Sequence, residues 1–152
     1  MKVSPGLRQT NAYKSELRRL IKLARIVRRA YEKIYDESSD LGGACFDASR
    51  QLFRLAKDNK LAVEIGIGDG HAFVLLGDTI VDVTATQFGK KQKVLITKRK
   101  QLEKRRWFGL FPWRLESRHD SVRSANRSWG DTCGRAYRQE RRVVLKVLDE
   151  TR

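Results

Sequence analysis

Cysteine, histidine and proline are scarce in this chain of 152 residues, which contains two of each. Cys45 and Cys133 are too few for the disulfide framework that small secreted domains use to supplement a small core. We therefore interpret both as free thiols in a reducing compartment, with a single disulfide as the alternative if the protein is exported. The cysteines and histidines also lack the short spacings of structural zinc sites, so we expect no metal and no cofactor.

Long apolar runs are absent as well. No stretch approaches the roughly 18 to 20 apolar residues that span a bilayer. The first residues, MKVSPGLRQTNAYKSELRR, contain no apolar signal-peptide core. The chain also has no phosphate-binding P-loop and no dinucleotide-binding fingerprint. We expect a cytoplasmic protein, or one delivered into a host cell, without a transmembrane segment.

Acidic residues are outnumbered, because 33 lysines and arginines face 18 aspartates and glutamates and give a net charge of +15. Counted along the sequence, the excess lies at the two ends, with +7 up to Asp36 and +12 from Lys90 onward, whereas the middle carries −4. Basic flanks of this kind favour acidic partners such as nucleic acid or an acidic protein. The other interpretation is a solvated surface that binds nothing.

Apolar residues at spacings of three and four predict two helices in the first part of the chain. The segment AYKSELRRLIKLARIVRRAYEKIY indicates a surface helix packed on the domain, with a membrane-surface helix as the alternative. Arginines and lysines cover its other side. Its apolar face comprises Leu17, Leu20, Ile21, Ala24, Val27, Tyr31 and Ile34.

After the break DESSDLGG, a second helix is predicted from Ala44 to Lys57, with Cys45 in its first turn. The residues expected to be buried on this helix are Ala48, Leu52, Leu55 and Ala56.

From Leu61 the pattern changes to short strand-like runs. LAVEIGI, HAFVLL, TIVDVT and KVLIT predict four strands, and the Gly77-Asp78 link is typical of a two-residue hairpin turn. The segment RAYRQERRVVLKVL predicts a C-terminal helix. We expect a single domain over 1–152, with a core at 41–97 and a basic, aromatic-containing extension at 98–152.

The predicted hairpin decides which side chains share a face of the sheet. With Gly77 and Asp78 in the turn, Phe73 lies opposite Asp82. His71 shares its face with Phe73, because the two are two residues apart. His71 and Asp82 are then diagonal neighbours on adjacent strands, with about 7 to 8 Å between their backbones. At this distance a carboxylate can orient the imidazole.

Cys45 supplies the nucleophile that an oriented histidine requires. A helix start and a nearby histidine both favour the thiolate form of a cysteine. Backbone amides at Gly43 and Ala44 can bind a developing oxyanion. Cys45, His71 and Asp82 therefore predict a catalytic thiol triad.

Each member of this triad also has a structural interpretation, as a small core cysteine, a hydrogen-bonded core histidine and a strand aspartate. The triad is favoured because an aspartate in an otherwise apolar strand requires a partner. We place Gln87 and Asp69 on the substrate side of the site.

The stretches GGACFDASRQLF and GHAFVLLGDTIVDVTATQF together resemble the core of the papain-like and transglutaminase-like thiol enzymes. The second is similar to small bacterial and phage proteins that read His-aromatic-Val and then Asp-x-Thr-x-x-Gln-Phe. This resemblance, over 41–89, implies an α+β papain-like fold with a central helix packed on an antiparallel sheet. It assigns nucleophile, base and orienting carboxylate to the same triad. The superfamily's oxyanion glutamine is missing, since Ser39 and Asp40 stand there, which implies backbone amides instead.

These features predict a thiol-dependent hydrolase or acyl transferase that acts on an amide bond of a protein or peptide substrate. The bond is a peptide bond, a glutamine side chain or a peptidoglycan-type linkage. The rival expectation is a binding module on the same scaffold, either a phage-type regulator that binds a host protein or a nucleic-acid binder. Phosphate contacts and base stacking suit the basic run and its neighbours Trp107, Phe108, Phe111 and Trp113.

Overall fold

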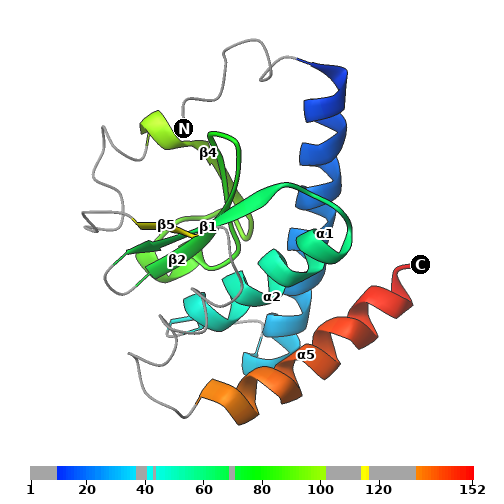
Figure 1. The fold of residues 1–152 in the computed structure, drawn as a ribbon. Helices are drawn as coiled ribbons and strands as arrows, with labels where there is room; N and C mark the ends of the chain where they lie inside the picture. Colours follow the sequence, from blue (N-terminus) through cyan, green and yellow to red (C-terminus); the bar gives the residue numbers. More distant parts are fainter. Residues whose placement is uncertain (1–9, 37–40, 43, 69–70, 102–113, 117–132) are drawn as a thin grey trace.

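The computed structural model of the chain describes residues 10–36, 41–42, 44–68, 71–101, 114–116 and 133–152. The predicted class, α+β with helices packed on an antiparallel sheet, is confirmed (Figure 1). The elements follow in the order α1 (Asn11–Tyr35), α2 (Cys45–Asp58), β1 (Val63–Gly68), β2 (His71–Leu76), β3 (Thr79–Asp82), the 3-10 helix η2 (Ala85–Phe88), β4 (Leu95–Lys98), β5 (Arg114–Glu116) and α5 (Cys133–Glu150).

The sheet has the strand order β4-β3-β2-β1-β5, and every neighbouring pair is antiparallel. The hairpin β2–β3 has the predicted register, with Leu76 opposite Thr79 and Val74 opposite Val81. Gly77 has a φ of 60° in the turn, a left-handed conformation that glycine adopts without steric cost. The two-residue link therefore fixes the pairing on which the arrangement of His71 and Asp82 depends.

Helix α2 packs on β1 and β2 of the sheet and also contacts α1 and α5 (Figure 1). The four residues predicted to be buried on it, Ala48, Leu52, Leu55 and Ala56, are all buried. The polar residues Arg50 and Gln51 are buried as well, because α5 covers the side of α2 that faces away from the sheet. The helix thus has neighbours on both sides, which holds its first turn in place.

Helix α1 buries the central part of its predicted apolar face, at Leu20, Ala24, Val27 and Tyr31. The expectation that basic residues all lie on its solvent side is wrong for one residue. Arg28 is buried, and so is Glu32 one turn later, with 3.0 Å between the guanidinium Nε and the carboxylate Oε1. Buried charges require partners, and here each supplies one for the other.

Helix α5 contains the predicted C-terminal helix and packs against α1 and α2. The buried Glu140 carboxylate accepts hydrogen bonds from Tyr31 at 2.7 Å and from Tyr35 at 2.8 Å. Gln51 of α2 donates to the backbone oxygen of Tyr137 at 3.0 Å. These bonds hold α5 against α1 and α2.

Candidate functional site

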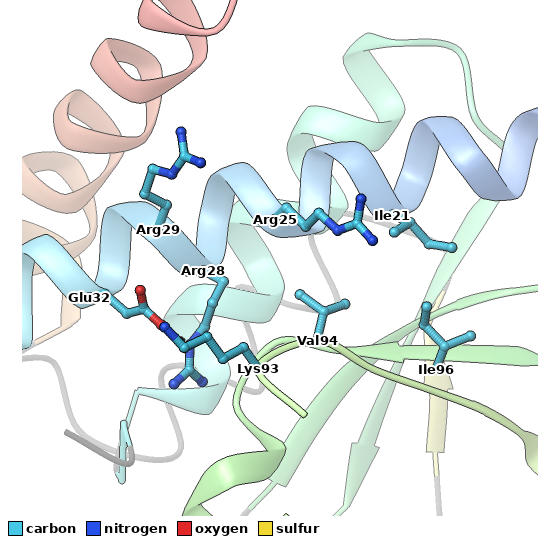
Figure 2. Close-up of a pocket in the computed structure, with 8 residues that line it drawn as sticks. All are labelled: Ile21, Arg25, Arg28, Arg29, Glu32, Lys93, Val94 and Ile96. Atoms are coloured by element: carbon cyan, nitrogen blue, oxygen red, sulfur yellow. Dashed lines mark hydrogen bonds and ion pairs between the residues drawn. The ribbon is translucent and has the colours of Figure 1, made fainter. Parts of the chain in front are cut away.

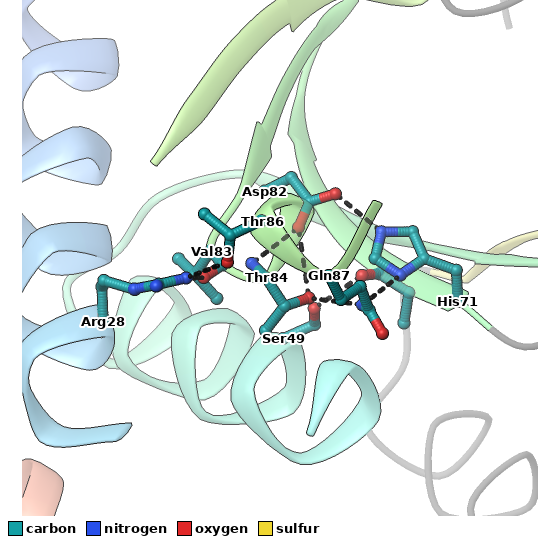
Figure 3. Close-up of polar contacts among 9 residues, drawn as sticks. Arg28, Ser49, His71, Asp82, Val83, Thr84, Thr86 and Gln87 are labelled. Atoms are coloured by element: carbon teal, nitrogen blue, oxygen red, sulfur yellow. Dashed lines mark hydrogen bonds and ion pairs between the residues drawn. The ribbon is translucent and has the colours of Figure 1, made fainter. Parts of the chain in front are cut away.

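Cys45 is the first residue of α2, and its side chain is 4% exposed. The turn before the helix is closed by the N–H of Ala44, which donates to the oxygen of Leu41 at 3.1 Å. One turn into the helix, the Ser49 hydroxyl donates to the backbone oxygen of Ala72 at 2.8 Å (Figure 3). Because Ala72 follows His71 in β2, this bond holds the start of α2 next to the histidine.

His71 and Asp82 meet as the hairpin geometry predicts. The His71 Nε2 atom lies 2.6 Å from Asp82 Oδ2, and both side chains are 0% exposed. The other carboxylate oxygen accepts a hydrogen bond from the backbone N–H of Thr84 at 2.9 Å. The Asp82 carboxylate is therefore oriented on one side by the backbone and holds the imidazole on the other.

The second ring nitrogen of His71 faces Gln87. The Gln87 Nε2 atom lies 3.2 Å from His71 Nδ1 and 3.3 Å from the Thr84 hydroxyl (Figure 3). In the neutral ring, Nε2–H donates to Asp82 and Nδ1 accepts from the Gln87 amide. This tautomer leaves a lone pair on Nδ1, which is the form that a general base requires.

Two aromatic rings border the imidazole. The edge-on ring of Phe88 has its centroid 4.8 Å from that of His71, and the Phe73 centroid lies 6.1 Å away. Phe73 has a fixed place because its ring packs directly over Gly66 of β1, where an added Cβ would come within 2.4 Å of it. These contacts exclude water from the imidazole and restrict its rotation.

The protonation of His71 is set by opposing effects. Burial of the ring is the largest single effect, and it lowers the pKa of His71. The charge and hydrogen bond of the Asp82 carboxylate, together with those of Cys45, outweigh burial, and the pKa rises from 6.5 to about 9. At neutral pH the ring is therefore an imidazolium, and its Nδ1–H can donate to the Cys45 sulfur or to the oxygen of a rotated Gln87 amide.

Arg28 of α1 binds the segment that follows Asp82. Its guanidinium Nη1 donates to the backbone oxygen of Val83 at 3.0 Å and to the Thr86 hydroxyl at 2.9 Å (Figure 3). These two residues flank Thr84 in the segment between Asp82 and Gln87. A single buried side chain of α1 thereby fixes the backbone that holds the histidine's partners.

The structure brings together the predicted Cys45, His71 and Asp82. Gln87, predicted on the substrate side of the site, contacts the imidazole directly. Gly43 and Asp69 lie outside the described residues. Ala44 is described, but its N–H already has the Leu41 oxygen as acceptor.

Four residues that contact the site, Thr84, Thr86, Phe88 and Arg28, were not among those predicted from the sequence. The first three lie within the pattern Asp-x-Thr-x-x-Gln-Phe, and this pattern could have indicated them.

The raised pKa of His71 predicts that the stability of the protein depends on pH. The folded-state value, about 9 in the intact site, exceeds the unfolded value of 6.5. Folding is thus stabilised fully below pH 6.5, and this stability is lost as the pH rises towards 9. The loss in urea melts should approach about 3 kcal/mol, at 1.36 kcal/mol per pKa unit.

The matched control is His71→Gln, in which this loss should disappear. An equal loss with and without His71 would show that other groups cause it.

No metal-binding cluster of three or more Cys, His, Asp or Glu side chains occurs in the described part of the chain, which leaves out His119. No helix of the described residues is long and apolar enough to cross a membrane. Comparisons with protein-family models, curated proteins and solved structures found no match to this chain. The function therefore has to be argued from the site itself.

Proposed function

We propose that this chain is a thiol-dependent hydrolase or acyl transferase of papain-like type, acting on an amide bond. The observation that supports it is the continuous chain of interactions from Cys45 to His71 and from His71 to Asp82. Nucleophile, base and orienting group in this order are the functional definition of a triad, whatever their positions in the sequence.

The proposed reaction begins with a thiolate–imidazolium pair. The Cys45 thiolate attacks the amide carbonyl carbon and forms a tetrahedral oxyanion. The His71 imidazolium then gives its Nδ1 proton to the leaving nitrogen, the C–N bond breaks, and a thioester remains on Cys45. Neutral His71 next takes a proton from water or an acceptor amine, which attacks the thioester carbonyl. The C–S bond breaks, the acid or new amide leaves, and the Cys45 thiolate and His71 imidazolium are restored.

Asp82 and the helix start have supporting roles in this mechanism. The Asp82 carboxylate stabilises the imidazolium and keeps Nδ1 directed towards the sulfur. The positive end of the α2 dipole, at Cys45, favours the negative charge of the oxyanion. Gln87 is a positioning residue, because its amide contacts the imidazole nitrogen that faces the reaction.

We expect Cys45 to react with iodoacetamide at neutral pH faster than Cys133. Both cysteines are the first residue of a helix, so the comparison separates the effect of His71 from that of a helix start. Mass-spectrometric labelling of each peptide with time gives both rates, and urea-unfolded protein gives the reference rate. A Cys45 that reacts no faster when folded than when unfolded would identify it as a core thiol and end the proposal.

A substrate screen follows a positive labelling result. Peptides, glutamine-containing peptides and peptidoglycan fragments are incubated with wild type and with Cys45→Ala. Hydrolysis, deamidation or amine transfer seen only with the wild type identifies the reaction. Mass spectrometry should also detect the acyl group as a thioester on Cys45.

The second candidate is a binding module on the same scaffold. The specific observation that favours it is the burial of Cys45, His71 and Asp82. A buried cluster whose polar groups are hydrogen-bonded to one another can also serve as part of a structural core. The aromatic residues that suggested nucleic-acid binding, Trp107, Phe108, Phe111 and Trp113, lie outside the described residues. Normal partner binding by an unreactive Cys45→Ala variant would favour this candidate.

A further inference from the structure

A groove separates α1 from β4 and the residues that lead into it (Figure 2). Its volume is about 420 Å³. Ile21 of α1 and Val94 and Ile96 of the β4 segment give it an apolar lining, and Ile96 is 44% exposed. Val94 and Ile96 are two residues apart in an extended segment, so both project to the side that faces α1.

The rim of this groove is basic. Arg25 and Arg29 are exposed and belong to adjacent turns of α1, and Lys93 lies across from them (Figure 2). The carboxylate of the groove, Glu32, is already used, because Lys93 and Arg28 each lie 3.0 Å from its Oε1 atom. Among the ion pairs of the described residues, none includes Arg25 or Arg29, so both guanidinium groups are available to a ligand.

Strand β4 adds a second property to the groove. It is the last strand in the sheet order and pairs with β3 on one side. The backbone groups on the outer side of an edge strand can pair with an added extended segment. The outer edge of β4, two apolar side chains of the β4 segment and two arginines of α1 thus lie within one short region.

We propose that this groove binds an extended acidic peptide segment in which apolar residues alternate with glutamates or aspartates. Alternate side chains of an extended peptide point to opposite sides. The set that faces β4 can therefore contact Val94 and Ile96, while the set that faces α1 reaches Arg25 and Arg29. Arginine is the residue best suited to carboxylates, because its planar fork makes two parallel hydrogen bonds.

A peptide fits the groove better than the other anionic partners that a basic protein attracts. The groove-lining residues include no aromatic ring on which a base could stack. A bilayer surface is flat on this scale and cannot reach a recessed apolar lining. The proposal concerns α1 and β4, and it holds whether or not Cys45 is catalytic.

The test is fluorescence anisotropy with a labelled peptide of about ten residues, long enough to span roughly 33 Å when extended, in which glutamate alternates with valine. The full chain should bind it in 0.15 M salt. The double variant Arg25→Glu with Arg29→Glu should weaken binding at least tenfold. The matched control is Arg138→Glu with Arg142→Glu, which makes the same charge change at the same spacing on exposed residues of α5 and should alter affinity less than threefold.

Two further arms examine the lining and the identity of the ligand. Ile96→Ser and a peptide with serine in place of valine should each weaken binding, since each removes apolar contact. Equal losses in the α1 and α5 variants would show only general charge attraction and overturn the proposal. The proposal is also overturned if the peptide does not bind. Binding of duplex DNA, single-stranded RNA or anionic vesicles that depends on Arg25 and Arg29 would then identify the class of ligand instead.

Discussion

Asp82→Asn is expected to slow the alkylation of Cys45 at neutral pH at least tenfold while leaving the fold intact. The asparagine oxygen can still accept from the Thr84 N–H, as Asp82 Oδ1 does at 2.9 Å. Its amide nitrogen then faces His71 Nε2 and must donate to it. That moves the ring proton of neutral His71 to Nδ1, the nitrogen that has to act as the base.

The magnitude follows from the charge that is lost. An adjacent opposite charge shifts a pKa by about 1 to 3 units, which corresponds to a tenfold to thousandfold change in the imidazolium population. Without the carboxylate, burial is the first effect on His71 and lowers its pKa, so the partner that stabilises the Cys45 thiolate is lost at neutral pH.

The experiment combines iodoacetamide labelling with a urea melt, and neither needs a known substrate. Asp78→Asn is the matched control, because Asp78 lies in the turn of the same hairpin and should leave the Cys45 rate unchanged. A destabilised Asp82→Asn protein whose Cys45 reacts at the normal rate would contradict the triad. Asp82 would then be a structural acid, with a cost on the order of 1 to 3 kcal/mol for a broken charged hydrogen bond.

Arg28→Met is expected to destabilise the fold by about 3 kcal/mol, the largest stability effect of the substitutions considered. Removing one partner of a buried ion pair typically costs 3 to 5 kcal/mol. The lower end applies because Glu32 keeps Lys93 as a partner. The Val83 oxygen and the Thr86 hydroxyl also lose their donor.

Urea melts of Arg28→Met and Arg25→Met measure this difference. Arg25 is exposed on the same helix, so its substitution should change the free energy of unfolding by less than about 0.5 kcal/mol. Arg28→Met should also slow Cys45 labelling, because the segment that carries Thr84 and Gln87 is no longer held. Equal effects of the two substitutions would mean that the Arg28 contacts contribute no net stability.

The arrangement of His71 and Asp82 could be predicted because it depends on local rules. A two-residue turn fixes the register of its hairpin, and the register fixes which side chains share a face. The position of Cys45 beside them was predicted only because an oriented histidine requires a nucleophile. It depends on how α2 packs against β2, a contact that includes the Ser49–Ala72 hydrogen bond.

The burial of Arg28 and Glu32 lay beyond what the sequence could predict. Helical periodicity identifies the apolar face of α1, but it does not show which segment will meet the edge of that face. Here the segment after β3, some 55 residues later, presents a backbone oxygen and a hydroxyl that make arginine favourable. The direct contact of Gln87 with the imidazole depends in turn on η2, a turn too short to show periodicity.

The hydrogen bond between Tyr31 and Glu140 joins residues 109 positions apart, whereas His71 and Asp82 are separated by 11. Closing a long loop costs more chain entropy than closing a short one, so local contacts have a kinetic advantage. The hairpin can form, and α2 can settle on it, before the C-terminal helix has docked. During synthesis, the contacts among His71, Asp82 and α2 can therefore form while α5 is still within the ribosome, and docking of α5 then covers the other side of α2.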